Sequence, residues 1–352
     1  MDQGKIESTP LFVIIIPIAH SIEDLRRCLA SLDTLDYRRD RFYVVLVDCG
    51  VVDGVKEFLS ENLSGYALRV SALFLPVNPS DARNWFIEKR INEARNYAMH
   101  VVAGLCYVFT EDDCTFEPDW LQKFEHSLSK EVGIMGGPDI LPQEMGLFPQ
   151  ALDCLLNSYL GTAGMRRGYG RRAKSYYPRK ENMAIPAAVI ANVGKFSEEI
   201  PVGGEMDMAK RARDDGFKVI YLPDNPVWHW RKTTPLNFIR LTAYTAFQKV
   251  KLLRMHNSFF MSAHFMVLAA IFAVTLIGLL SLASSHARFL IAVFAGVYLS
   301  ALFFTAVSSI MHTRSVIAGL TVFLLLPFHH LSLISGIISG VIAKIKHHEE
   351  RQ

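Results

Sequence analysis

The sequence predicts an α/β domain with a mostly parallel, doubly wound sheet, followed by helices that cross a membrane. Two observations lead to this prediction. Over about the first 230 residues, apolar β-branched runs alternate with amphipathic stretches, a pattern typical of parallel sheets covered by helices on both faces. Charge then nearly disappears, because only 5 of the 37 Lys+Arg and 2 of the 34 Asp+Glu lie beyond residue 255.

The predicted strands are short apolar runs, two of which end in acidic residues. They are LFVIIIPI at 11–18, FYVVLV at 42–47 before Asp48, a run at 70–75, LCYVF at 105–109 before Glu111-Asp112-Asp113, and FKVIYL at 217–222. Ser21 caps a predicted helix after the first strand, and further helices are predicted over 53–63 and 87–103. Ligands of such sheets bind beyond the carboxyl ends of the strands, where Asp48 and the acidic triplet fall.

Three uncharged runs make up the charge-poor part of the chain. They are 255–287, 289–313 and 315–343, separated by Arg288 and Arg314. Each is longer than the roughly 20 residues needed to span a bilayer. The third run contains Pro327, His329 and His330, so we expect it to kink, re-enter or lie partly at the interface. The predicted parts are a domain at 1–232, basic interfacial helices at 233–256, a membrane domain with two or three spans at 257–343, and a polar tail at 344–352.

The orientation in the membrane follows from the flanking charges. The basic residues just before the first run are Arg240, Lys249, Lys251 and Arg254, and the positive-inside rule places them in the cytosol. Three full spans would leave Lys344, Lys346 and Arg351 outside, whereas two spans and a re-entrant third run would satisfy the rule. The sequence leaves both arrangements open. We expect a multi-pass protein of the cell (inner) membrane with its first domain in the cytoplasm, and no secretory signal at the N-terminus.

Composition excludes several other classes of protein. Positive and negative charges balance over residues 1–255, so nucleic acid is not an expected partner. The five cysteines include no C-x-x-C pair, which argues against a disulfide framework and a zinc site and fits a reducing compartment.

The triplet Glu111-Asp112-Asp113 is the first candidate for chemistry. Carboxylates crowded at a strand end repel one another, and a divalent cation such as Mg²⁺ or Mn²⁺ relieves that repulsion while binding substrate phosphates. A metal–diphosphate site is therefore one interpretation. An acidic loop or helix cap is the other, because Glu117 and Asp119 follow closely.

Four further positions have both a functional and a structural interpretation. Asp48 can accept hydrogen bonds from a base or ribose, or can stabilise an ordinary turn. Arg95 can contact a phosphate or brace the acidic loop, or can be a solvated helical arginine. In Gly203-Gly204-Glu205-Met206-Asp207 a carboxylate can act as a general base or can cap the helix. His229 can complete a metal shell or be a buried structural histidine. The basic stretch 164–180 is either a solvated loop or a clamp on an anion.

The order of these pieces forms a resemblance. ARNYA at 94–98, FTEDD at 109–113, ENMAIP at 181–186, VGKF at 193–196 and GEMDMAKR at 204–211 come in the order seen in family 2 glycosyltransferases with the GT-A fold. The match covers about residues 11–231. Within that family the chain most resembles membrane-anchored bacterial exopolysaccharide glycosyltransferases of the succinoglycan type.

The resemblance implies an inverting transfer from a nucleotide-sugar, most simply a UDP-sugar, with Mn²⁺ or Mg²⁺. Site residues follow position by position. Asp48 and Asp53 match nucleotide-binding positions, and Arg95, Glu111 and Asp112 are expected at the donor. Asp113, Glu111 and His229 are expected at the metal. Glu205 falls at the position of the catalytic base, and Asp207 is the second choice.

Some positions depart from the family pattern. Cys49 and Val51 stand in the nucleotide-binding motif, Glu111 replaces the first Asp of D-x-D, and Gly204-Glu205 replaces a Glu-Asp pair. The Gln-x-x-Arg-Trp motif of processive synthases is absent, which favours a single addition.

The acceptor is expected to be a lipid-linked glycan, because the catalytic domain is tied to a membrane. The apolar stretch 147–163 is either a segment against the bilayer or a buried core helix. An enzyme that glycosylates polyprenyl phosphate is an alternative, although the presence of Glu205 favours a sugar hydroxyl. A non-catalytic protein that binds nucleotide-sugar or acts as a scaffold is a third hypothesis.

Overall fold

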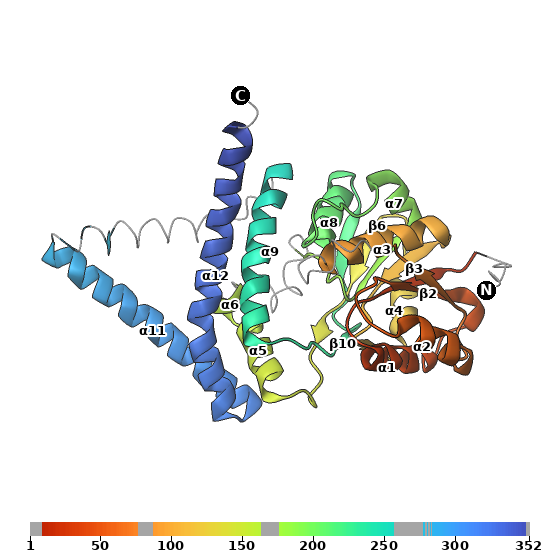
Figure 1. Cartoon of the computed structure of the whole chain (residues 1–352), viewed down its shortest axis with the longest axis horizontal. Coiled ribbons are helices and arrows are strands. Elements are labelled where there is room, and N and C mark those ends of the chain that lie inside the picture. The colour runs from red at the N-terminus through yellow and green to blue at the C-terminus, as the bar shows by residue number, and fades with distance from the viewer. Residues whose placement is uncertain are drawn as a thin grey trace. The chain divides into compact units, whose positions relative to one another are not determined.

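The computed structural model describes residues 9–76, 87–162, 176–256 and 284–349, with isolated positions between 277 and 282. The chain forms two compact units (Figure 1). The sheet unit comprises Met1–Pro142 and Tyr169–Arg231, and the helical unit comprises Gln143–Gly168 and Lys232–Gln352. The first domain was predicted as one continuous stretch, 1–232. The described residues 143–162 instead belong to the helical unit, where Ala151, Leu152 and Leu155 are buried.

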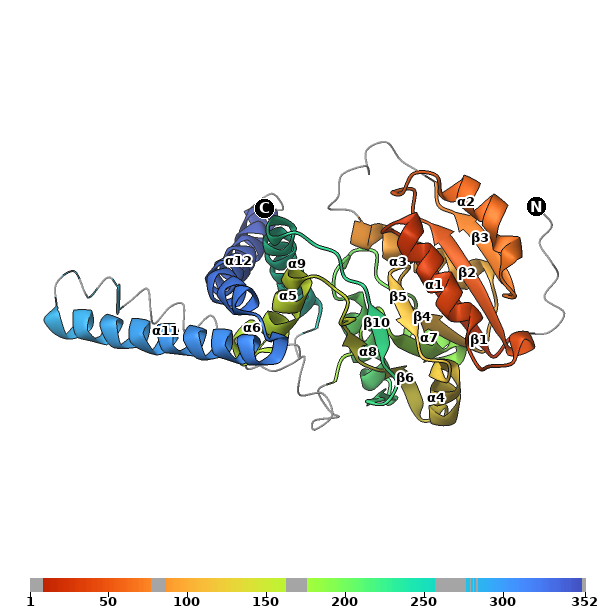
Figure 2. The ribbon, with the colours of Figure 1, turned by 90° about the horizontal axis from the view of Figure 1, so that it is seen from below.

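The sheet unit is built on a seven-stranded sheet. Its order is β3 (Val70–Phe74), β2 (Phe42–Asp48), β1 (Phe12–Ile18), β4 (Cys106–Phe109), β8 (Met183–Pro186), β6 (Val132–Gly136) and β9 (Lys218–Tyr221). Every neighbouring pair is parallel except the two pairs that β8 makes with β4 and β6. A small second sheet has the order β5 (Cys114–Phe116), β10 (Val227–His229) and β7 (Asp139–Ile140), and Figure 2 shows β5 beside β10. The predicted mostly parallel sheet is confirmed.

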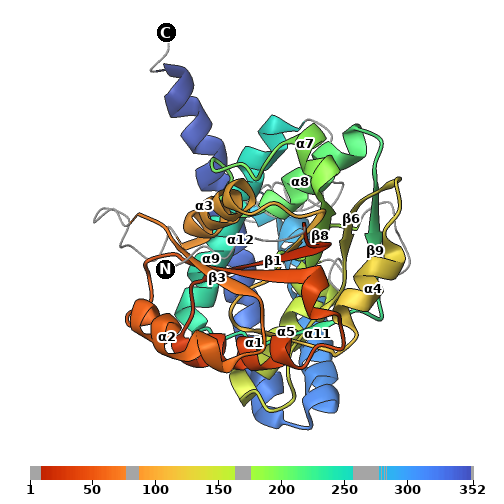
Figure 3. The same ribbon diagram turned by 90° about the vertical axis from the view of Figure 1, so that its right-hand side faces the viewer.

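Helices cover both faces of the large sheet (Figure 3). One face carries α1 (Ile22–Asp33), α2 (Val55–Asn62) and α4 (Trp120–Ser127), and the other carries α3 (Ile87–Val101), α7 (Ala187–Val193) and α8 (Gly204–Asp214). Two short 3₁₀ turns, Arg39–Arg41 and Leu63–Gly65, lie between elements. Alternate residues of β1 divide between the layers, since Ile14 and Ile16 enter one core while Val13 and Ile15 enter the other. This period of two explains why the strand is apolar throughout.

The elements of the sheet unit begin and end close to their predicted positions. All five predicted strands agree with the observed ones to within about one residue, and the helices agree to within about two. Ser21 caps α1 as expected, because its hydroxyl accepts a hydrogen bond from the Asp24 N–H at 3.1 Å.

The helical unit contains α5 (Leu147–Asn157), α6 (Tyr159–Thr162), α9 (Pro235–Met255), α11 (Ser285–Thr313) and α12 (Val316–Glu349). The predicted interfacial helices at 233–256 form the single helix α9, which packs beside α12 (Figure 1). The third uncharged run forms one helix that continues through Pro327. Most of the first run, 257–276, lies outside the described residues.

Two described helices are long and apolar enough to cross a membrane. They are α11, with a mean hydropathy of 2.3, and Val316–Ala343 of α12, with a mean hydropathy of 1.9. The stretch 147–163 was predicted to lie against a bilayer or in a core. Ala151, Leu152 and Leu155 of α5 are buried in a cluster with α11 and α12. Of the basic stretch 164–180, residues up to 175 lie outside the described part.

Candidate functional site

Charged side chains gather beyond the carboxyl end of β4. Strand β8 runs antiparallel to β4 with Met183 opposite Phe109, so Glu181 lies past the end of β4. In the small sheet, His229 of β10 is opposite Cys114 of β5, which brings its ring to the acidic triplet. The sheet topology thus assembles one cluster from three distant parts of the chain.

Asp113 and His229 form the centre of this cluster. His229 Nε2 lies 3.1 Å from Asp113 Oδ2, and His20 Nε2 lies 3.7 Å from the same oxygen. Burial alone would raise the pKa of Asp113, but the two imidazoles hold it well below its usual value. Burial also opposes ionisation of both histidines, yet the carboxylates raise the pKa of His229 to about 9 and that of His20 to about 10. The carboxylate of Asp113 is therefore buried and paired with two imidazoles.

Glu111 is buried and paired with two cations. Its Oε1 lies 2.9 Å from Lys180 Nζ and 3.7 Å from an Arg95 guanidinium nitrogen. Lys180 also donates to both oxygens of Glu88, at 2.9 and 3.0 Å. Burial alone would raise the pKa of Glu111, but Lys180 and His20 lower it. The carboxylate of Glu111 is thus ionised and already neutralised by its neighbours.

Asp112 has partners other than the expected donor. Its Oδ2 accepts hydrogen bonds from the backbone N–H groups of Ala19 and His20, each at 3.0 Å, and its Oδ1 lies 2.6 Å from His20 Nδ1. The residue is fully buried. Both oxygens of Asp112 thus bind the loop after β1 and position His20, and donor binding by Asp112 stays a prediction.

Arg95 contacts the site from α3 through its guanidinium group. It is 1% exposed, which rules out a solvated helical arginine. Its guanidinium donates to the Lys180 carbonyl at 3.0 Å and lies near Glu111. Of the expected roles, the contacts therefore support the brace on the acidic loop.

Asp48 and Asp53 are the two residues expected to bind the nucleotide, and they lie at the end of β2 and in the turn that follows it. Asp48 ends β2, and its Oδ1 accepts a hydrogen bond from the Gly50 N–H at 2.7 Å. Arg90 fixes the adjoining loop by donating two hydrogen bonds to the Cys49 carbonyl, at 3.1 and 3.0 Å. Asp53 is exposed in the turn before α2. The turn interpretation of Asp48 is correct, and its second oxygen leaves capacity for a ligand.

The two acidic residues in the first turn of α8 differ in their surroundings. Asp207 is 2% exposed, and its Oδ2 accepts two hydrogen bonds from Arg211, at 3.0 and 2.7 Å. Glu205 is half-buried, and burial raises its pKa, with further effects from Lys180, Glu181 and Arg95. Glu205 therefore belongs to the electrostatic neighbourhood of the cluster, whereas Asp207 holds Arg211.

Four residues of the cluster were not predicted from the sequence. His20 follows a buried strand, so the rule on strand ends could have indicated it. Lys180 and Glu181 precede β8, and their position depends on an antiparallel pairing that no local pattern reveals. Asp139 lies 3.6 Å from His229 Nδ1 and binds Arg231 at 2.6 Å. It belongs to β7, a strand of two residues that is too short to predict from the sequence.

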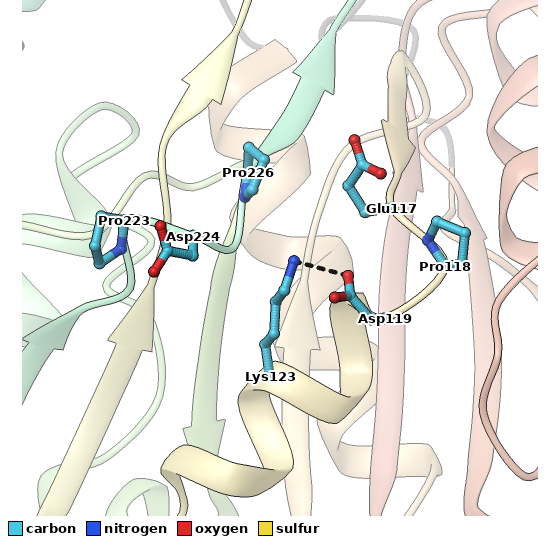
Figure 4. Close-up of a pocket in the computed structure, with 7 residues that line it drawn as sticks. All are labelled: Glu117, Pro118, Asp119, Lys123, Pro223, Asp224 and Pro226. Atoms are coloured by element: carbon cyan, nitrogen blue, oxygen red, sulfur yellow. Dashed lines mark ion pairs between the residues drawn. The ribbon is translucent and has the colours of Figure 1, made fainter.

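A separate hollow of about 630 Å³ lies elsewhere on the sheet unit. Figure 4 shows its lining, which consists of Glu117, Pro118, Asp119, Lys123, Pro223, Asp224 and Pro226. Lys123 and Asp119 form an ion pair across 2.7 Å. The lining contains none of the residues of the buried cluster, so we do not assign the chemistry to it.

Comparison with known families decides the class of the protein. The sequence profile of the family described as Glycosyltransferase like family 2 matches residues 10–245, which is more than half of the chain. The chain belongs to glycosyltransferase family 2. The resemblance drawn from the motifs is confirmed at the level of the family, and the succinoglycan type stays a prediction.

Two similar proteins give further context. Glycosyltransferase AglE of Haloferax volcanii is 22% identical over 217 residues, which are 61% of this chain and 65% of that protein. The chain thus matches less than two thirds of the relative's length. The mannosyltransferase PcManGT of Pyrobaculum calidifontis, solved with GDP-Man and Mn²⁺, superimposes with a TM-score of 0.63 at 16% identity. That superposition covers 96% of this chain and 88% of the other, and it confirms the predicted GT-A fold.

The buried cluster of this family 2 chain fits a divalent cation. Asp113, His229 and Cys114 form one group whose ligand atoms lie within 4.8 Å of one another, and Glu111, Glu181 and His229 form another. The 3.1 Å between Asp113 Oδ2 and His229 Nε2 is close to the roughly 3 Å between adjacent ligands of an octahedral ion. Carboxylate and imidazole are ligands that Mn²⁺ accepts. Asp113 and His229 share one of these groups, whereas Glu181 lies 3.9 Å from the other ring nitrogen of His229 and Glu111 is paired with Lys180.

Proposed function

We propose that this glycosyltransferase transfers one sugar, with inversion, from a nucleotide-sugar to a lipid-linked glycan at the membrane, and that a divalent cation assists the transfer. One observation carries the proposal. A buried carboxylate–histidine cluster around Asp113 and His229 lies at the carboxyl ends of the strands, and the half-buried Glu205 is electrostatically coupled to it. Single displacement needs a base for the acceptor hydroxyl and stabilisation of the leaving diphosphate, and a separated base and metal site would supply both.

The roles of the residues follow from their charges. A bound metal would neutralise the departing nucleoside diphosphate. Asp113 and His229 would hold it, while Lys180 and Arg95 keep Glu111 ionised beside them. Glu205 takes the proton from the acceptor hydroxyl as that oxygen bonds to the anomeric carbon. The bond from that carbon to the diphosphate oxygen breaks, and the electron pair leaves with the diphosphate.

Asp48 and Asp53 are the proposed contacts to the nucleotide. Asp48 ends a central strand and keeps one oxygen outside its turn, which suits a hydrogen bond from a base or ribose. The sequence favours a UDP-sugar. GDP-mannose and Mn²⁺, which PcManGT binds, belong in the first donor screen as well.

Membrane attachment is the second half of the proposal. Helices α11 and α12 have the length and hydropathy of membrane segments. A multi-pass protein of the inner membrane with its sheet unit in the cytoplasm would meet a lipid-linked acceptor where the head group leaves the bilayer. The Glu205 base favours a sugar hydroxyl over a phosphate, which is already ionised.

A donor screen tests the proposal. Purified full-length protein in detergent is given UDP-, GDP- or dTDP-sugars with Mn²⁺, Mg²⁺ or EDTA, with and without membrane lipid extract. We expect metal-dependent release of one nucleoside diphosphate, lost in Asp113→Ala and kept in Asp119→Ala, which alters an exposed ion pair of the separate hollow.

Two outcomes would contradict parts of the proposal. Nucleotide binding without release from any donor, despite lipid extract, would mean a non-catalytic protein. Turnover with polyprenyl phosphate as the only acceptor would mean a polyprenyl-phosphate glycosyl synthase.

A further inference from the structure

Helices α11 and α12 are both long and apolar, but they pack differently. In α11 the buried residues are few: Ala287, Leu302, Ala306 and Ser309. In α12 a continuous stripe is buried, comprising Ala318, Val322, Leu325, Leu326, His329, Ser332 and Ile337. Figures 1 and 2 show α11 running away from α9 while α12 lies along it. By length and composition both helices are candidate membrane spans, but their surroundings in the protein differ.

The first half of α12 packs on a segment that leaves the sheet unit and returns to it. Ala318, Val322 and Leu326 form a core with Leu152 and Leu155 of α5. Both ends of the α5–α6 segment continue into the sheet unit, through β7 before it and β8 after it. The segment is therefore on the same side of the membrane as the sheet unit.

Two adjacent histidines tie α12 to this segment. His329 Nε2 donates to the Gly161 carbonyl at 2.9 Å, and His330 Nε2 donates to the Leu160 carbonyl at 2.8 Å. These hydrogen bonds give two carbonyl groups of α6 a partner on α12. The middle of α12 is thus held at the level of α6.

The second half of α12 packs on the basic helix α9. A Cβ atom at Gly336 would lie 2.1 Å from the Ala243 carbonyl oxygen, and Arg254 donates to the Gly340 carbonyl at 2.6 Å. Only residues 230–234 separate β10 from α9. Four basic residues, Arg240, Lys249, Lys251 and Arg254, lie along α9, and each costs several kcal/mol in the hydrocarbon core.

These contacts leave too little of α12 to cross a bilayer. The part before its contact with α9, Val316–Phe328, is about 13 residues, or about 20 Å of helix. The hydrocarbon core is about 30 Å thick. A spanning α12 would draw α9 and its charges into that core.

We propose that α12 does not cross the membrane, and that it lies along the bilayer surface on the same side as the sheet unit. Its outer face is apolar and exposed at Leu320, Leu324, Phe328, Leu331 and Ile338, and this face would rest on the acyl chains. Arg314, Lys344 and Lys346 then join the basic residues of α9 on the cytoplasmic side, as the positive-inside rule requires. This inference rests on the membrane attachment proposed above.

Spin labels at matched positions measure the depth of the two helices. Leu331→Cys and Leu299→Cys lie near the middles of α12 and α11, with exposures of 61% and 54%. Each is made with Cys154→Ser, since the other four native cysteines are buried. In nanodiscs we expect the label at 299 near the bilayer centre, about 15 Å deep, and the label at 331 only about 5–10 Å deep.

The location of the chain end gives an independent readout. An epitope is placed after Gln352, and Ser60→Cys on the exposed side of α2 reports the side of the sheet unit. In sealed vesicles we expect protease to reach the epitope on the side where an impermeant maleimide labels Ser60→Cys.

The outcomes separate the two proposals. Labels of equal depth at 299 and 331, or an epitope on the side opposite Ser60→Cys, would overturn the inference and leave membrane attachment intact. A fully active protein that stays soluble without detergent would instead overturn membrane attachment.

Discussion

At the scale of single residues, the site consists of buried carboxylates whose negative charge is offset by neighbouring cationic side chains. Four carboxylates, Glu111, Asp112, Asp113 and Glu181, are each less than 9% exposed. Two imidazoles, Lys180 and Arg95 offset them. Buried charges persist only when they are paired or bind a metal. A cation that enters with the donor would therefore take over neutralisation that protein groups supply in its absence.

The two acidic residues of α8 can be separated by substitution. We expect Glu205→Gln to lower the transfer rate by about 10²–10⁴-fold, the usual contribution of a general base, with donor binding unchanged. Asp207→Asn should instead cost about 1–3 kcal/mol of stability, because the buried Asp207 loses the charge that Arg211 binds. Single-turnover rates and thermal unfolding measure the two effects. A stable Asp207→Asn variant that loses transfer would reverse the assignment.

The pH dependence of transfer reports the same residue. Burial raises the pKa of Glu205, and only its ionised form accepts a proton. The rate should therefore fall as the pH drops through a pKa above the usual value of glutamate. Rate profiles with saturating donor and metal, measured for the wild type and for Glu205→Gln, test this. An acidic limb that is identical in the variant would show that another group controls it.

At the scale of elements, strands and helices were predictable because each satisfies a local pattern. The apolar run of β1 and the Ser21 cap of α1 depend on neighbours within a few residues. The positions of Glu181 and His229 depend on which strands pair, and that is decided by long-range packing. The candidate site could thus be predicted at Asp113, His229 and Glu205, whereas Lys180 and the inward role of Asp112 could not.

The contact of α9 with α12 depends on a glycine that only the structure reveals. A Cβ atom at Gly336 would lie 2.1 Å from a backbone carbonyl oxygen, whereas one at Gly296 of α11 would meet nothing within 4 Å. We expect Gly336→Ala to destabilise the helical unit by about 1–3 kcal/mol through overpacking. Gly296→Ala should be neutral or slightly stabilising. Thermal unfolding in detergent compares them, and equal melting temperatures would argue against the close contact.

At the scale of the whole molecule, the chain passes between the two units three times. It leaves the sheet unit after Pro142, returns with Tyr169, and leaves again after Arg231. The boundary at 232 that composition predicts is therefore only the last of these crossings. The crossing after Pro142 leaves no mark in the composition, because the segment 143–168 is too short to change the average charge and hydropathy of the first domain.

A truncation tests this interleaving. Ending the chain at Arg231 removes α9, α11 and α12, so the apolar face of α5 loses its partners. We expect the truncated chain to aggregate, and Leu152→Lys with Leu155→Lys to restore its solubility. The same pair in the full-length chain should lower the melting temperature, because both side chains are buried there. Size-exclusion chromatography gives the answer, and a soluble truncated chain without substitutions would contradict it.

Because the chain alternates between the two units, α5 is synthesised long before the helix that covers it. About 160 residues separate the end of α5 from the start of α12, the helix that covers it. At about 5–20 residues per second, the ribosome needs roughly 10–30 s to make them. During that interval Leu152 and Leu155 have no native cover, so the nascent chain must be shielded by a chaperone or by the membrane surface until α12 emerges.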